Sequence, residues 1–158
     1  MKNSNKKRMI IDADACPVSV KKAVLDICRQ SHADLIFVAS LAHAGSERLG
    51  GKWVFVDAVK EEADMYIINH SAKHDIVVTQ DYGLASLLLP KGVHVLSPRG
   101  RIYTEFNIGN LLQDRYLSAK ARKAGSRTKG PPRFTEEDLM SFTSSLKKIL
   151  SNDEGIDS

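Results

Sequence analysis

The chain has 158 residues, of which 42% are hydrophobic, so it can bury one sizeable core but is too short for two domains of ordinary size. Its formal net charge is only +4 at pH 7. No apolar run approaches the ~20 residues of a membrane helix, and the N-terminus has no apolar signal core, so we expect a single cytoplasmic domain with no membrane association.

Short apolar runs and helical patterns alternate along the chain. Five runs are typical of strands covered on both faces: Met9–Asp12, Leu35–Ala39, Trp53–Val56, Ile76–Val78 and Val93–Leu96. Helices are predicted over Pro17–Ser31, Val59–Ala72, Tyr82–Leu89, Ile108 to about Tyr116, and Thr135–Leu150. This alternation predicts an α/β fold with a mostly parallel central sheet.

The C-terminal third contains a segment without helical or strand patterning. Lys120 to Arg133 is rich in Gly, Pro and cations and has almost nothing to bury, which is typical of an exposed basic loop. Thr135, with Asp138 three residues later, is a good N-cap for the last helix. We expect residues 1–8 and 151–158 to be flexible tails.

Charge is distributed unevenly along the chain. Between Lys91 and Arg133 there are ten basic and two acidic residues, a net charge of +8. From Ile10 to Leu89 there are seven basic and eleven acidic residues, so the front half is net negative. This polarity favours an anionic partner whose charge is also bridged by a metal ion at the acidic end.

Aspartates follow two of the predicted strands. Asp12 and Asp14 come after the first strand, on the same side of an extended chain, and Asp81 follows Ile76–Val78. The carboxyl ends of parallel strands form the edge where ligands bind. Because crowded carboxylates repel one another and no arginine is expected among them, the usual way to keep several ionised is a hard cation with oxygen ligands. The pattern therefore predicts a site for Mg²⁺ or Mn²⁺.

Helix capping is the competing interpretation for each aspartate taken alone. Asp14 precedes a helix that starts with proline, and Asp81 precedes the helix at Tyr82. Asp57, which follows the third strand, could cap a helix or join the cluster. Asp64 lies in a predicted helix whose apolar face would point it near the same edge, and His43 could approach that edge from a loop.

Several unusual motifs occur together in this chain: DADACP, VVTQDYGLA, LSPRGRIYTEFNIGNLL and TKGPPRFTEEDL. From Ile10 to Leu150 the chain resembles the YaiI/YqxD family, a bacterial family placed among PIN-like nuclease domains. The resemblance implies a three-layer α/β/α PIN-like fold and an acidic magnesium or manganese site. It assigns Asp12, Asp64 and Asp81 to that site, whereas Asp14 belongs to the family's own DADACP motif.

The first functional hypothesis is a metal-dependent nuclease that hydrolyses RNA. Asp12, Asp64 and Asp81 would be catalytic, and these residues together with Asp14 would hold Mg²⁺ or Mn²⁺. Basic residues of the back half would hold the backbone of RNA, or of another phosphate-rich polyanion, without reading sequence: Arg99, Arg101, Arg115, Arg122 and Lys129.

Two other functions fit the same residues. The cations alone would suit a non-catalytic RNA-binding module or ribonucleoprotein accessory protein, or only a solvated surface with no nucleic-acid role. Alternatively, Asp12 and Asp14 would be the nucleophile and the acid/base of an aspartate-based phosphatase, although Cys16 stands where that chemistry usually has Thr or Val. The sequence leaves the substrate and the oligomeric state open.

Overall fold

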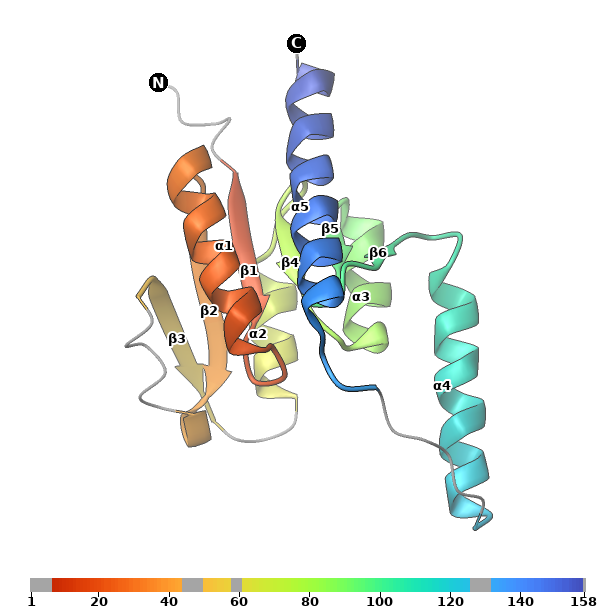
Figure 1. Cartoon of the computed structure of the whole chain (residues 1–158). Helices are drawn as coiled ribbons and strands as arrows, with labels where there is room; N and C mark the ends of the chain where they lie inside the picture. Colours follow the sequence, from red (N-terminus) through yellow and green to blue (C-terminus); the bar gives the residue numbers. More distant parts are fainter. Residues whose placement is uncertain (1–6, 44–49, 58–60, 126–131, 158) are drawn as a thin grey trace.

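The computed structural model describes residues 7–43, 50–57, 61–125 and 132–157. In this part of the chain, six strands form one sheet in the order β3-β2-β1-β4-β5-β6 (Figure 1). All neighbouring strands are parallel except β5 and β6, which are antiparallel. The strands are β1 (Arg8–Asp12), β2 (Asp34–Ser40), β3 (Lys52–Val56), β4 (Ile76–Val78), β5 (His94–Leu96) and β6 (Ile102–Tyr103). The predicted α/β fold with a mostly parallel sheet is confirmed.

Helices cover both faces of this sheet. They are α1 (Val18–Ser31), α2 (Glu62–His70), α3 (Tyr82–Leu88), α4 (Ile108–Lys123) and α5 (Glu136–Asp157), with short 3₁₀ turns at Leu41–His43 (η2) and Leu89–Lys91 (η4). Helices α1 and α5 lie on one face, and α2 and α3 lie on the other (Figure 1). The arrangement is consistent with the three-layer α/β/α fold. No helix in the described ranges is both long enough and apolar enough to span a bilayer.

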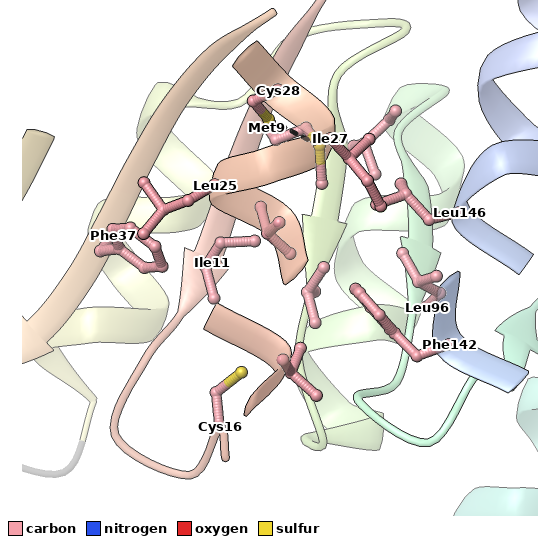
Figure 2. Packing of buried hydrophobic residues seen from close by; sticks show 14 of the residues in the cluster. Met9, Ile11, Cys16, Leu25, Ile27, Cys28, Phe37, Leu96, Phe142 and Leu146 are labelled. Carbon is pink, nitrogen blue, oxygen red and sulfur yellow. Dashed lines mark hydrogen bonds between the residues drawn. The ribbon is translucent and has the colours of Figure 1, made fainter. Parts of the chain in front are cut away.

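Alternation along β1 assigns its side chains to the two layers. Met9 and Ile11 pack with residues of α1 and α5 in one core cluster, where Cys28 donates a hydrogen bond from Sγ to Met9 Sδ at 3.4 Å (Figure 2). Ile10 packs with residues of α2 and α3 in the other cluster. Side chains two residues apart on a strand share a face. The next residue on the Ile10 side is Asp12, which therefore projects toward α2 and α3.

Several predicted boundaries differ from the structure. Pro17 is the extended N-cap of α1, with φ −60° and ψ 149°, so the helix begins at Val18. Helix α4 continues to Lys123, so the first residues of the stretch expected to be a loop are helical; its residues 126–131 lie outside the described ranges. Helix α5 extends to Asp157, where we expected a flexible tail from residue 151. Strand β6 was not predicted, because two residues are too few to show periodicity.

One predicted helix start is confirmed, and one predicted helix is shorter than expected. Thr135 caps α5, since its Oγ1 accepts from Asp138 N at 3.1 Å while Asp138 Oδ2 accepts from Thr135 N at 2.9 Å. Helix α2 was predicted over Val59–Ala72 and is observed over Glu62–His70, with residues 58–60 outside the described part. Thr135 and Asp138 form a reciprocal capping box, which satisfies amides that a helix leaves unpaired at its start.

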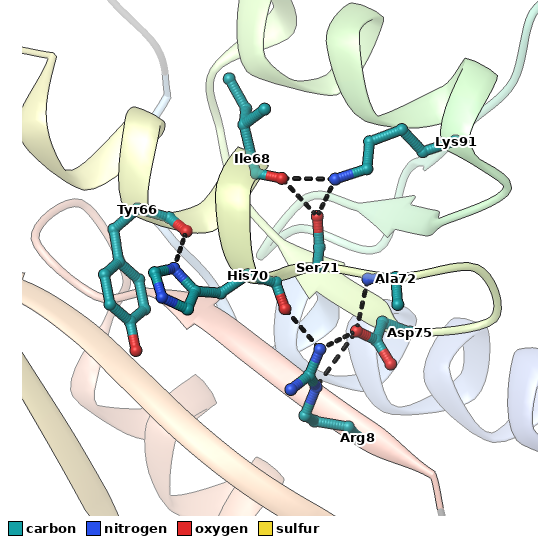
Figure 3. A network of polar contacts seen from close by, with 8 residues as sticks. All are labelled: Arg8, Tyr66, Ile68, His70, Ser71, Ala72, Asp75 and Lys91. Atoms are coloured by element: carbon teal, nitrogen blue, oxygen red, sulfur yellow. Dashed lines mark hydrogen bonds and ion pairs between the residues drawn. The ribbon is translucent and has the colours of Figure 1, made fainter.

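At the amino end of the sheet, a buried carboxylate has a full set of partners (Figure 3). Asp75 Oδ2 accepts hydrogen bonds from Arg8 Nη2 at 2.6 Å and from Ala72 N at 2.8 Å. Arg8 also donates to the carbonyl of His70, and Lys91 donates to the carbonyl of Ile68, both in the last turn of α2. These cations satisfy carbonyls at a helix C-terminus, where positive charge is favoured.

Candidate functional site

The two central strands end at the point where the strand order reverses. From β1 the chain proceeds to β2 and β3 on one side, and it then crosses to β4 on the other side of β1. Helices that follow neighbouring strands on opposite sides of such a point leave a crevice beyond the carboxyl ends of the strands. In this structure, Asp12 ends β1, and the segment from Thr79 to Asp81 follows β4.

Thr79 joins the two strand ends. Its hydroxyl donates to Asp12 Oδ2 at 2.8 Å, and its Oγ1 accepts from Asp81 N at 3.0 Å. The Thr79 side chain is fully buried, and its amide donates to Leu96 O at 3.0 Å. Thr79 therefore orients Asp12 and fixes the backbone of Asp81. Thr79 was not predicted to be a site residue. Its position as a polar residue directly after an all-apolar strand is the sequence feature that could have identified it.

Asp81 caps helix α3. Its Oδ1 accepts from Gly83 N at 2.9 Å and from Leu84 N at 3.2 Å, as the capping interpretation predicted. The same oxygen lies 3.3 Å from Nη1 of Arg115, which belongs to α4. The expectation that no arginine lies among the carboxylates was therefore wrong, because α4 brings a residue 34 positions away to this edge.

Asp64 projects from α2 toward the same strand ends. Burial, followed by the negative charges of Asp81 and Asp12, raises the pKa of Asp64 to about 6. Burial also raises the pKa of Asp12; the hydrogen bond from Thr79 lowers it, and the charges of Asp14 and Asp81 raise it further. The structure thus brings Asp12, Asp64 and Asp81 together around one cavity, where the charges of Asp81 and Asp12 disfavour ionisation of Asp64.

Asp14 fastens the loop after β1 to the end of β2. Its Oδ1 and Oδ2 lie 3.0 and 3.1 Å from Ser40 N, which donates to them. Asp14 is exposed, and its charge contributes to the raised pKa of Asp12. The capping alternative for Asp14 is not what the structure shows, since the α1 N-cap is Pro17 and no side chain caps that helix.

These residues line a cavity of about 740 Å³. Its acidic side chains are Asp12, Asp14, Glu61, Asp64 and Asp81, and its cation is Arg115. Gln80 closes one side by donating from Nε2 to Ala15 O at 2.6 Å. Within the described ranges, no three His, Cys, Asp or Glu side chains are arranged as a ready-made metal site. The donors are nevertheless hard oxygens that repel one another, so they fit the chemistry of a divalent cation.

The remaining predicted residues are spread over other surfaces. Arg99 donates from Nη1 to Asp138 Oδ2 at 2.8 Å and lies 5.5 Å from the centre of the Phe134 ring, so it ties its loop to the start of α5. Arg101 is exposed in the β5–β6 turn, and Arg122 is exposed near the end of α4. Asp57 is exposed and does not line the cavity. Lys129 and the side chain of His43 lie outside the described part of the chain.

The sequence matches to known proteins include the residues of the acidic cavity. Residues 10–152 match the family described as "Uncharacterized BCR, YaiI/YqxD family". UPF0178 proteins with similar sequences occur in Bacillus velezensis (50% identical over 155 residues, 98% of this chain and 91% of the relative), Bacillus cytotoxicus (47% over 152 residues, 96% and 98%) and Listeria innocua (42% over 145 residues, 92% and 98%). No solved structure matches the chain. Since the match runs from β1 into α5 and includes Asp12, Asp64 and Asp81, the chain belongs to the YaiI/YqxD family, as its motifs predicted.

Proposed function

We propose that this protein is a divalent-metal-dependent phosphodiesterase that hydrolyses RNA in the acidic cavity. The observation that carries the proposal is the convergence of Asp12, Asp64 and Asp81 on one cavity at the carboxyl ends of β1 and β4, where burial, and after it the charges of neighbouring aspartates, raise the pKa of Asp12 and Asp64. Perturbed carboxylates in a cleft are typical of functional sites. At the opposite edge of the sheet, Asp75 is paired with Arg8, which is the arrangement expected of a structural carboxylate.

Asp12, Asp64 and Asp81 would hold Mg²⁺ or Mn²⁺. The chemistry that such an ion supplies is a lowered pKa for a bound water molecule and neutralisation of charge on the phosphate oxygens. The hydrogen bond from Thr79 to Oδ2 would orient the Asp12 carboxylate as a metal ligand. Asp64 projects from a helix, and a carboxylate on a rigid element holds its position better than one on a loop.

Helix α4 supports RNA as the phosphodiester substrate. Arg115 lines the acidic cavity, and the last turn of α4 adds the exposed cations Lys120, Arg122 and Lys123. None of the helix's residues is buried, and Figure 1 shows α4 standing away from the sheet. Exposed cations on a helix that reaches a carboxylate site can hold a polyanion backbone near that site without reading its sequence.

The test is cleavage of single-stranded RNA by purified protein with Mg²⁺ or Mn²⁺. We expect Asp12→Asn and Asp64→Asn to lower the rate by about 100-fold or more, since each removes a metal ligand. The control is Asp114→Asn, which removes one charge from an exposed position of α4 and should leave the rate unchanged. Cleavage at the wild-type rate by both active-site variants, or in excess chelator, would rule out the proposal.

A non-catalytic RNA-binding module is the second candidate. It is favoured by the structural tasks that Asp81 and Asp14 already perform, at the start of α3 and at the end of β2. In that case RNA binding would weaken with salt, survive Asp12→Asn and Asp64→Asn, and be accompanied by no turnover with either metal.

A further inference from the structure

We propose that a second cavity, next to the acidic one, binds the nucleotide that adjoins the cleaved phosphate, with its base on Tyr82 and its phosphate on Arg101. The cavity has a volume of about 620 Å³ and lies between the β5–β6 turn and the start of α5. It shares two lining residues, Gln80 and Tyr82, with the acidic cavity. This inference rests on the proposed function, because it treats the two cavities as neighbouring subsites for one RNA strand.

Gln80 and Tyr82 form the wall between the two cavities. Gln80 is anchored to Ala15 O, and Tyr82 begins α3 directly after the cap residue Asp81. A strand that enters the acidic cavity therefore passes the side chain of Tyr82 to reach the second one. A fixed wall of this kind places two successive units of a chain at a defined spacing.

The loop that carries the cations is ordered before any ligand binds. Ser97 Oγ accepts from the amides of Arg99 and Arg101 at 3.2 and 3.1 Å, and Ser97 N donates to Arg101 O at 2.8 Å. Gly100, with φ +93°, packs against Ser141 of α5. The backbone of Arg101 is thus fixed by hydrogen bonds on both sides, which lowers the entropy lost when its side chain binds a phosphate.

The two arginines of this loop have different tasks. Arg99 is used within the protein, because it pairs with Asp138 and lies over Phe134. Arg101 is exposed, and within the described ranges no carboxylate forms an ion pair with it. Arg101 and Tyr103 both line the cavity. Arg101 is therefore the cation placed to bind a phosphate there.

Tyr82 offers a surface for a base. Its ring meets the Tyr103 ring edge to face, with centroids 5.7 Å apart and an interplanar angle of 69°. This geometry leaves at least one face of Tyr82 uncovered by its partner, and Tyr82 is only half-buried. Stacking of a base on an aromatic side chain contributes about 1–3 kcal/mol and accepts any base. An aromatic face and an arginine that line the same cavity match a nucleotide better than they match inorganic phosphate alone.

The experiment is a titration of the full-length, ¹⁵N-labelled protein with adenosine 5′-monophosphate in the presence of EDTA, followed by NMR. We expect the amide signals of Ser97, Arg99, Gly100 and Arg101 to shift with a single Kd. Arg101→Ala and Tyr82→Leu should each raise that Kd by about five-fold or more. Arg29→Ala, which removes an exposed arginine from α1, is the matched control and should bind like the wild type.

The ligand controls separate the two contacts. Adenosine, which lacks the phosphate, should bind to the wild type and to Tyr82→Leu more weakly than the monophosphate binds to the wild type. Arg101→Ala should not lower the affinity for adenosine, because adenosine has no phosphate for Arg101 to contact. With short single-stranded RNA and Mn²⁺, Arg101→Ala should raise KM with little change in kcat. Signals of residues 97–101 that do not move, or an Arg101→Ala variant that binds and cleaves like the wild type, would overturn the subsite.

Failure of this inference is distinguishable from failure of the proposed function. Nucleotide-dependent shifts in EDTA without any RNA cleavage would support the subsite while rejecting the phosphodiesterase. Cleavage that depends on Asp12 but is indifferent to Arg101 would reject the subsite while supporting the phosphodiesterase.

Discussion

The hydroxyl of Thr79 donates a hydrogen bond to Asp12 across 67 positions of sequence; Asp12 ends β1, and Thr79 directly follows β4, the parallel strand beside it. The bond lowers the pKa of a carboxyl that burial and its acidic neighbours raise. Because the same hydroxyl oxygen accepts from Asp81 N, one buried side chain links both strand ends of the acidic cavity. The position of Asp12 in the cavity therefore depends on a residue that has no charge of its own.

Thr79→Val should destabilise the protein and raise the pKa of Asp12. Valine has a similar shape but leaves Asp12 Oδ2 and Asp81 N without this partner, which costs about 1–3 kcal/mol in the free energy of unfolding. Urea unfolding measures the first effect, and NMR titration of the Asp12 carboxyl measures the second. Thr79→Ser keeps the hydroxyl and should retain most of the stability. Equal stability of the valine variant and the wild type would show that the hydrogen bond contributes nothing.

Asp64 should make the protein less stable as pH rises from about 4 to above 6. Its pKa is raised from 3.8 to about 6 in the folded state, so the folded protein binds more protons than the unfolded chain in this window, and the free energy of unfolding falls with increasing pH. Asp64→Asn removes this contribution and should reduce the fall, as measured by urea unfolding at several pH values. Glu62→Gln, on the exposed side of the same helix, is the control. An unchanged slope for Asp64→Asn would contradict the raised pKa.

Arg115→Ala should change cation binding and RNA binding in opposite directions. Arg115 neutralises Asp81 at 3.3 Å, so its loss should tighten Mn²⁺ binding by a few-fold, measured by calorimetry. The same variant should bind RNA more weakly because a phosphate contact is lost. Lys123→Ala, in the last turn of α4, should weaken RNA binding without affecting Mn²⁺. Parallel changes of both affinities in Arg115→Ala would indicate a general loss of structure at the site.

Gly100→Ala should destabilise the protein severely. An added Cβ would lie 2.4 Å from Ser141 Oγ and 2.6 and 2.7 Å from backbone atoms of Ser141, at a residue with φ +93°. The backbone of α5 cannot move away without disrupting its packing, so we expect a loss of roughly 3 kcal/mol or more. Gly109→Ala is the matched control, since its Cβ meets nothing within 4 Å at the start of α4, and it should be neutral or slightly stabilising. A thermal melt of both variants compares them directly, and similar melting temperatures would contradict this account.

Local patterns were sufficient for most of the fold. Continuous β-branched runs identified β1, β2, β3, β4 and β5, because a strand covered on both faces needs apolar side chains on both. The reciprocal pair of Thr135 and Asp138 identified the start of α5 for a similarly local reason. Helix α4 was predicted too short, because its last turn is basic apart from Ala121 and shows no apolar stripe that would reveal the helical period.

The order of residues along the chain was enough to place Asp12 and Asp14 at the end of β1 and Asp81 after β4. It did not reveal that β1 and β4 are neighbours at the reversal of strand order, that Thr79 donates to Asp12, or that Arg115 pairs with Asp81. These two kinds of feature differ in the range of the interactions that produce them. Periodicity and capping involve residues a few positions apart and can be recognised in a single sequence. Strand order and long-range ion pairs depend on which distant segments pack together to bury the two apolar faces of the sheet.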